Sequence, residues 1–246
     1  MQTKRLRVFA GPNGSGKSTI TRIVAEEGYD LGVYVNADDI KQVLIKSREL
    51  DFNKYQVIVD EKIFLEQLSK SQVIQKAEQK INNADIHIVD NHLSIALEGE
   101  VNDYFVAFVA DFLRVALLSA GKKFSFETVM SHRSKIEFMK QAKAAGYKVY
   151  LYYVALKDPE LNVLRVNWRV EEGGHTVPEE KIRSRYYSSL SLLSEAVSVA
   201  DNSYIFDNSG GEHRLLAQVV NKELKVLVDY YPSWFEEYYI DTILVE

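Results

Sequence analysis

Residues 11–18 read Gly11-Pro12-Asn13-Gly14-Ser15-Gly16-Lys17-Ser18 and match the phosphate-binding template G-x-x-x-x-G-K-[ST] at every fixed position. The glycines let successive backbone N–H groups turn inward onto phosphates, and the helix expected next presents its positive end to them. In this template Lys17 reaches the β- and γ-phosphates and Ser18 offers its hydroxyl to Mg²⁺. A strand-like segment precedes the motif and a helical one follows it, which disfavours a glycine-rich turn without ligand. We therefore predict nucleotide binding by residues 11–18 and the adjoining Thr19.

The sequence around this motif alternates between strand-like and helix-like segments. Apolar, β-branched and aromatic runs predict strands over residues 6–10, 33–35, 124–126, 148–156 and 204–206, the last of which closes the pattern. Helical periodicity is expected directly after the motif, after Asp39, and over residues 131–145, 159–170 and 178–200. Strands and helices that alternate at this spacing predict an α/β fold, a parallel sheet flanked by helices, as in P-loop NTPases.

Two regions depart from this rhythm. Residues 49–100 contain a helical pattern over 57–81 and a strand-like run at 86–89, and we interpret them as a mostly helical insertion within a single domain spanning residues 1–246. The extension at about 210–246 carries six aromatic residues between Tyr230 and Tyr239, a density that favours docking or a dimer contact over base binding. In the insertion, His87, Asp90 and His92 could in principle ligate a metal, but three such residues near a turn are usually just polar.

Composition excludes several classes of protein. The 246 residues include 30 Lys and Arg against 35 Asp and Glu, for a net charge of −5, and no cysteine. Thiolate metal sites, disulfides and cysteine nucleophiles are therefore excluded, and no global basic field attracts nucleic acid or an anionic membrane. The apolar stretch 104–120 is interrupted by Asp111 and Arg114, which predicts a buried helix with a paired charge instead of a membrane span. We expect a cytoplasmic protein.

A phosphoryl-transfer enzyme needs a carboxylate that deprotonates the acceptor, and two strand ends supply candidates. Asp38 and Asp39 follow the second predicted strand, whose carboxyl end is expected to face the same crevice as the P-loop. We favour Asp38 as the base, although one of the pair could instead cap the next helix. Glu127 and Thr128 end the third strand, where Glu127 could bind acceptor hydroxyls or water-bound Mg²⁺, or pair with Arg133 or another basic group.

Basic residues cluster late in the chain, at Arg165, Arg169, Arg183 and Arg185. Arg165 and Arg169 lie four residues apart on one helix face, and Gly173-Gly174 separates their helix from the next. This arrangement predicts a lid that closes over a triphosphate. His175 could contact a phosphate or cap the helix that follows. After the last predicted strand, Asn208 lies in a loop that could contact the base.

Taken together, the segments GPNGSGKS, NADDI, FSFET, KVYLYYVAL and RVEEGGHTVPEEKIRSRY resemble the zeta-toxin family of P-loop kinases over residues 4–48 and 120–209. The GGHxVP version is similar to the broader branch described as predicted ATPases. The resemblance implies ATP or GTP with Mg²⁺, a UDP-sugar such as UDP-N-acetylglucosamine as acceptor, and an antitoxin protein as partner. It also implies roles for single residues: phosphate binding by Lys17, magnesium ligation by Ser18, catalysis by Asp38, sugar binding by Glu127, and lid functions for Arg165 or Arg169 and for His175.

The leading functional hypothesis is an ATP-dependent phosphotransferase that moves the γ-phosphate to a small-molecule hydroxyl. Other P-loop classes lack support, because there is no LSGGQ-like run and the Asn221-Lys222 pair lacks the Asp that guanine-specific proteins carry. The alternative is a nucleotide-binding regulatory or interaction protein without acceptor kinase activity. The insertion and the aromatic extension motivate that alternative.

Overall fold

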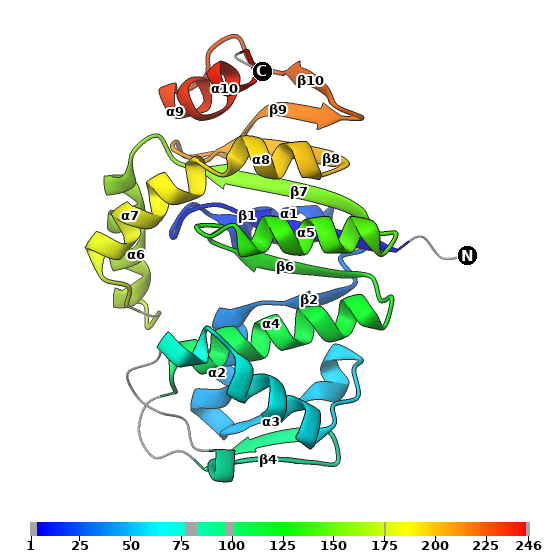
Figure 1. The fold of residues 1–246 in the computed structure, drawn as a ribbon. Helices are drawn as coiled ribbons and strands as arrows, with labels where there is room; N and C mark the ends of the chain where they lie inside the picture. Colours follow the sequence, from blue (N-terminus) through cyan, green and yellow to red (C-terminus); the bar gives the residue numbers. More distant parts are fainter. Residues whose placement is uncertain (1–3, 77–82, 97–100, 175, 245–246) are drawn as a thin grey trace. The chain divides into compact units, whose positions relative to one another are not determined.

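The computed structural model describes residues 4–76, 83–96, 101–174 and 176–244, and Figure 1 labels their helices and strands. The chain divides into two compact units. Unit 1 comprises residues 1–31 and 127–246, and unit 2 comprises residues 32–126.

Unit 1 contains a sheet with the strand order β10-β9-β8-β7-β1. The strands are β1 (Arg5–Ala10), β7 (Lys148–Ala155), β8 (Asn202–Asp207), β9 (Arg214–Val220) and β10 (Glu223–Val226). β1, β7 and β8 are parallel, and Val8, Leu151 and Ser203 lie opposite one another across them. β9 and β10 extend the sheet in antiparallel orientation. The predicted α/β fold with a parallel sheet is therefore confirmed, with an antiparallel edge added.

The prediction that residues 204–206 close the sheet is wrong. β9 and β10 form a hairpin whose two-residue loop is Asn221-Lys222, with φ of 54° and 68°. Positive φ at both loop positions is typical of the tight turns that join antiparallel strands. The sequence indicates this hairpin only weakly, because neither of its two loop residues is a glycine.

Helices cover both faces of this sheet (Figure 1). On one face, α1 (Lys17–Glu26) packs Ile20 and Val24 against Phe9 and Tyr152. On the other face lie α5 (Ser134–Ala144) and α8 (Leu193–Val199), which contact β7. Two further helices, α6 (Pro159–Glu171) and α7 (Glu179–Leu190), pack against each other. The Tyr153 hydroxyl of β7 hydrogen-bonds Ser189 of α7 at 2.9 Å, so α7 is tied to the sheet.

The single helix predicted over 178–200 is two helices, α7 and α8. The Leu192 N–H bonds the Ser189 carbonyl, three residues earlier, and this tighter turn ends the α-helical pattern. Leu190 and Leu193, on the two sides of the break, are both fully buried.

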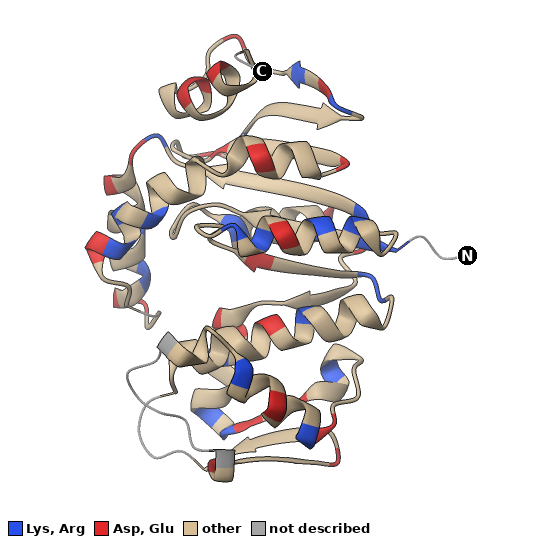
Figure 2. Cartoon of the chain, in the orientation of Figure 1, with Lys and Arg blue, Asp and Glu red and all other residues tan. Residues whose placement is uncertain are grey.

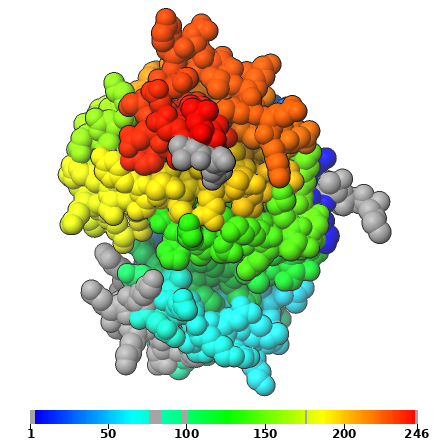
Figure 3. Space-filling view, turned by 45° about the horizontal axis from the view of Figure 1, so that its top comes forward, coloured from blue at the N-terminus to red at the C-terminus, as the bar shows by residue number. Residues whose placement is uncertain are grey.

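The aromatic extension docks onto unit 1, as predicted. After α9 (Ser233–Phe235) the chain continues through a π-helical segment, Glu236–Ile240, into α10 (Asp241–Leu244). The π-helical segment contacts α8, and Figure 3 shows this red end of the chain lying against the yellow α7–α8 region. Three of its aromatic side chains, Trp234, Phe235 and Tyr239, are buried.

In unit 2, β2 (Val33–Val35) pairs in parallel with the first residues of β6 (Phe124–Thr128). Its two longer helices are α2 (Ala37–Ser47) and α4 (Asp103–Ser119). The insertion contributes a second, antiparallel sheet of order β3-β5-β4, with β3 (Glu49–Asp51), β4 (Ile86–Val89) and β5 (His92–Ile95). Shorter elements are α3 (Glu61–Lys70) and the 3₁₀ turns Phe52–Tyr55, Ile74–Lys76 and Asn83–Asp85.

The expectation of a mostly helical insertion is therefore only partly correct. The helix predicted over 57–81 is α3, which begins at Glu61 after the N-cap Asp60 and ends at Lys70; residues 77–82 lie outside the described part of the chain. The strand at 86–89 is confirmed. Phe64 of α3 packs edge-on against Phe108 and Phe112 of α4, so α3 helps to form the core of unit 2.

The long apolar segment forms the buried helix α4, as predicted. Asp111 and Arg114 form the expected ion pair within it, and the Arg114 guanidinium lies 4.8 Å from the centre of the Phe126 ring. Burial lowers the pKa of Arg114 to about 10, so the group stays charged at neutral pH. Across the part of the chain that the structure describes, no helix is both long and apolar enough to cross a bilayer.

Candidate nucleotide-binding site

The P-loop lies between β1 and α1, as the template requires. Three of its glycines have positive φ: 141° at Gly11, 72° at Gly14 and 95° at Gly16. A side chain would also clash with backbone at Gly11 and Gly14, and would displace the Asn208 side chain at Gly16. An added Cβ would lie 1.9 Å from the Val154 carbonyl oxygen at Gly11, 2.8 Å from the Asn162 carbonyl oxygen at Gly14, and 2.2 Å from Asn208 Nδ2 at Gly16. The glycines are therefore fixed by conformation and by packing.

Two asparagine side chains hold the P-loop from outside. Asn162 of α6 donates from Nδ2 to the Asn13 carbonyl at 2.5 Å, and Asn208 donates from Nδ2 to the Ser15 carbonyl at 2.9 Å. With these carbonyls bound, the backbone N–H groups at the start of α1 are the donors that can face an anion. The N-cap Gly16 has no side chain to satisfy them. This arrangement is that of a phosphate cradle.

Lys17 closes the cradle from within. Its Nζ donates to the carbonyls of Gly11 and Pro12 at 3.0 and 2.8 Å. Thr19, also predicted here, belongs to the first turn of α1 and donates its N–H to the Gly16 carbonyl. A bound triphosphate would offer the lysine a charged acceptor in place of two neutral ones, and hydrogen bonds to charged groups are the stronger kind.

Ser18 and Glu127 meet beside the cradle. The Ser18 hydroxyl donates to Glu127 Oε2 at 2.9 Å, and the Thr21 hydroxyl donates to Oε1 at 3.0 Å. We did not predict a role for Thr21 from the sequence. Its position one helical turn after Ser18 was the feature that could have indicated it. A hydroxyl beside a carboxylate suits Mg²⁺, which proteins usually bind through one or two carboxylates together with substrate phosphates. Among the described residues, no group of three or more His, Cys, Asp or Glu side chains could hold a metal, so His87, Asp90 and His92 form no such cluster.

The other residues predicted around β6 have local partners. The Thr128 carbonyl accepts the Gly11 N–H at 3.2 Å, and its hydroxyl accepts the Met130 N–H at 3.1 Å, so Thr128 ties the P-loop to the turn after β6. The Arg133 side chain is 74% exposed and forms an ion pair with Glu195 at 3.2 Å.

The predicted lid corresponds to α6 and α7, along which Figure 2 marks both basic and acidic residues. Arg165 donates to the Asn208 carbonyl at 2.8 Å and is therefore joined to the P-loop clamp. Arg183 instead links the two lid helices, because it bridges to Glu160 of α6 at 2.6 Å and to Glu179 at 2.9 Å. These hydrogen bonds lower the pKa of Glu160 and raise the pKa of Arg183.

The glycine pair after α6 caps the helix. Gly173, with φ of 91°, donates to the Val170 carbonyl, and Gly174 donates to the Arg169 carbonyl at 2.8 Å. This pattern is a Schellman motif, and a Cβ at Gly174 would lie 2.7 Å from Arg169 Cγ. The cap therefore fixes the backbone next to Arg169. His175 lies outside the described residues.

Asp38 and Asp39 lie in unit 2, in the first turn of α2, and both are exposed. The N-cap of this helix is Asn36, whose side chain accepts the Asp38 N–H at 2.9 Å. Asn36, two residues before Asp38, therefore has the capping role that we considered for Asp38. Burial, with a smaller contribution from the charge of Asp39, raises the pKa of Tyr55 to about 12.

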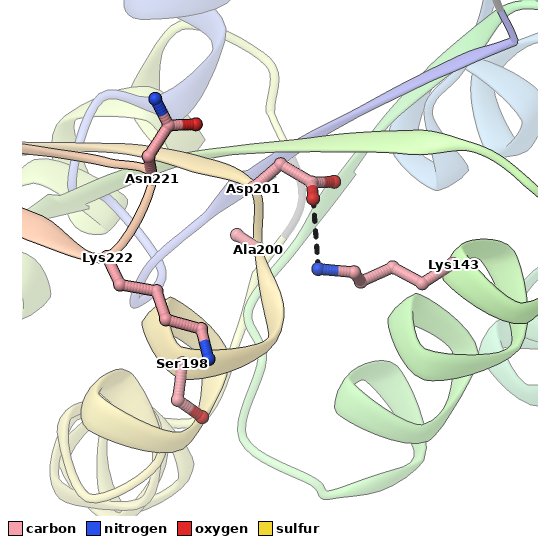
Figure 4. A pocket seen from close by; sticks show the side chains of 6 residues that line it. All are labelled: Lys143, Ser198, Ala200, Asp201, Asn221 and Lys222. Carbon is pink, nitrogen blue, oxygen red and sulfur yellow. Dashed lines mark hydrogen bonds and ion pairs between the residues drawn. The ribbon is translucent and has the colours of Figure 1, made fainter.

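Figure 4 shows a polar cavity of about 210 Å³ in unit 1, lined by Lys143, Ser198, Ala200, Asp201, Asn221 and Lys222. Asp201 binds the Lys143 ammonium at 3.0 Å and accepts the Val149 N–H at 2.7 Å. The cavity lies where β7 and β8 begin, whereas the P-loop follows the end of the parallel strand β1. It is therefore not part of the nucleotide site.

A parallel sheet flanked by helices, with a glycine-rich phosphate cradle between β1 and α1, defines a P-loop NTPase fold. A family model described as Zeta toxin matches residues 97–217, which confirms the predicted resemblance to the zeta-toxin family. The matched stretch begins after residues 11–18, so the phosphate cradle is identified by its template and geometry.

Two solved structures are similar in fold, and one further protein is similar in sequence. AvrRxo1-ORF1:AvrRxo1-ORF2 solved with ATP has a TM-score of 0.53 at 20% identity, covering 91% of this chain and 60% of that chain. The same complex solved with sulphate ions has a TM-score of 0.52 at 19% identity, and the match covers 91% of this chain and 61% of that chain. An uncharacterized Haemophilus influenzae protein is 38% identical over 87 residues, which is 30% of this chain and 62% of that protein. The chain thus spans about 60% of the length of these relatives.

Proposed function

We propose that this protein is an ATP-dependent phosphotransferase of zeta-toxin type, which transfers the γ-phosphate to a small-molecule hydroxyl. The observation that carries the proposal is the cradle of residues 11–18 with the Ser18–Glu127 pair at its edge. The similar fold solved with ATP supports ATP as the donor. A UDP-amino sugar such as UDP-N-acetylglucosamine is the acceptor, and an antitoxin protein the partner, that the family resemblance suggests.

In the proposed reaction Asp38 accepts the proton of the acceptor hydroxyl, whose oxygen then bonds to the γ-phosphorus. The bond from that phosphorus to the β,γ-bridging oxygen breaks, and ADP leaves. Lys17 and the lid arginines Arg165 and Arg169 offset the negative charge of the transferred group. Ser18, assisted by Glu127, would hold Mg²⁺, which neutralises phosphate charge when bound.

The test is transfer of label from γ-labelled ATP to UDP-N-acetylglucosamine, with the adjacent carboxylates as a matched pair of variants. Asp38→Asn should reduce transfer by about 10²- to 10⁴-fold, because it removes the general base. Asp39→Asn, one residue along the same exposed helical turn, should leave most of the activity. Lys17→Ala should abolish nucleotide binding.

Equal transfer rates in Asp38→Asn and Asp39→Asn would contradict the assignment of the base. Tight ATP binding without transfer to this sugar, or to any hydroxyl compound in a metabolite extract, would contradict the phosphotransferase. The regulatory alternative, a protein that binds nucleotide without an acceptor, would then be favoured.

A further inference from the structure

The C-terminal segment, residues 233–244, reaches the end of β8 through one buried hydrogen bond. Trp234 is 2% exposed, and its Nε1 donates to Asp207 Oδ1 at 3.3 Å. Asp207 is 5% exposed and is the last residue of β8. A buried carboxylate needs hydrogen-bond donors to compensate for lost hydration, so the indole N–H is part of what keeps Asp207 in place.

Asp207 in turn fixes the turn that follows it. The Ser209 hydroxyl donates to the same Oδ1 at 2.5 Å and accepts the Lys157 N–H at 2.7 Å. Between these two anchored residues, Asn208 donates its N–H to the Ala155 carbonyl at 2.9 Å. Residues 207–209 are therefore held on both sides of Asn208.

Asn208 is the residue that clamps the P-loop at the Ser15 carbonyl, and its amide lies against Gly16. Its own carbonyl accepts from Arg165 of the lid. The contacts thus run without interruption from Trp234 through Asp207 and Asn208 to the phosphate cradle.

We propose that the C-terminal segment is a positioning element of the nucleotide site, with Trp234 as its positioning residue. The segment does not touch the nucleotide. It keeps the 207–209 turn in the arrangement in which Asn208 binds the Ser15 carbonyl. With that carbonyl turned outward, the N–H groups of the cradle face inward. The inference rests on the proposed nucleotide binding.

The experiment compares Trp234→Phe, which removes the N–H while keeping an aromatic ring, with Met139→Ala as a packing control. Met139 is fully buried in α5, outside the C-terminal segment, so its truncation destabilises unit 1 without removing either donor to Asp207. Ser209→Ala removes the other donor to Asp207. The Kd of a fluorescent MgATP analogue, kcat, and backbone hydrogen exchange of the peptide covering residues 11–18 are measured for each.

Trp234→Phe and Ser209→Ala should each raise the nucleotide Kd about fivefold, the effect of losing one ordinary hydrogen bond, with a much smaller change in kcat. Both should speed hydrogen exchange in the 11–18 peptide. Met139→Ala should lower the melting temperature at least as much as Trp234→Phe, yet leave the Kd and the exchange of that peptide unchanged.

A wild-type Kd in Trp234→Phe, or an equal Kd increase in Met139→Ala, would overturn the inference and leave the proposed function intact. If the wild-type protein bound no nucleotide, or Lys17→Ala bound it equally well, the proposed function would fail. Hydrogen exchange in the unliganded protein would still decide the coupling, because unchanged exchange of the 11–18 peptide in Trp234→Phe would overturn it.

Discussion

Gly16 combines two constraints that can be separated by experiment. Its φ of 95° disfavours any side chain, and a Cβ would in addition meet the Asn208 amide. Gly146 provides the matched control, because its φ is 81° and an added Cβ would meet nothing within 4 Å. The left-handed conformation alone costs a non-glycine residue about 1–2 kcal/mol.

We predict that Gly16→Ala and Gly146→Ala both lower the free energy of unfolding by about 1–2 kcal/mol, as measured by urea denaturation. Only Gly16→Ala should also weaken ATP binding, because the new methyl group displaces the Asn208 clamp. If Gly146→Ala weakened ATP binding to the same degree, the clamp would have no special role.

At the scale of elements, the lid helices are held together by charge as well as by apolar contact. Val163, Val166 and Ile182 form a small buried cluster between α6 and α7, and the bridge from Arg183 to Glu160 and Glu179 lies on its exposed side. Exposed ion pairs contribute little stability, so the apolar cluster contributes more than this bridge to holding the two helices together.

The bridge predicts a specific pH dependence. Because the hydrogen bond from Arg183 lowers the pKa of Glu160, the bridge is complete above the ordinary Glu pKa and is lost as pH falls through the lowered value. Carbon-detected NMR titration should show Glu160 titrating below the ordinary glutamate pKa. Arg183→Gln should raise the pKa of Glu160 toward the ordinary glutamate value. Lys181→Gln, on the same helix as Arg183, should leave the pKa of Glu160 unchanged. An unchanged Glu160 titration in Arg183→Gln would contradict this.

For the molecule as a whole, ligand binding should appear as global stabilisation. A ligand at ten times its Kd stabilises the native state by about 1.4 kcal/mol, which for a chain of this size is a rise in melting temperature of about 3–6 °C. We predict this shift with ATP and Mg²⁺, a smaller shift when EDTA removes the metal, and none in Lys17→Ala. A full shift in Lys17→Ala would place the nucleotide outside the P-loop.

The family match spans residues 97–217 and therefore runs through parts of both units. The residues of the phosphate cradle and of the lid belong to unit 1, whereas Asp38 and the inserted sheet belong to unit 2. Sequence alternation predicted the strands and helices of both units well. It predicted β4 but not β3 and β5, which complete the inserted sheet, and it missed the β9–β10 hairpin.

Local sequence information was sufficient to predict the phosphate cradle, the parallel core and the docking of the aromatic extension. Glycine positions set backbone φ, and apolar periodicity sets which faces are buried. The remaining features arise only in the folded chain. The Asn162 and Asn208 clamps join residues 149 and 193 positions apart, and the roles of Thr21 with Glu127 and of Trp234 with Asp207 are likewise non-local. No local pattern carries such pairs, because a side-chain amide or indole acquires its partner only when the folded sheet brings distant strand ends together.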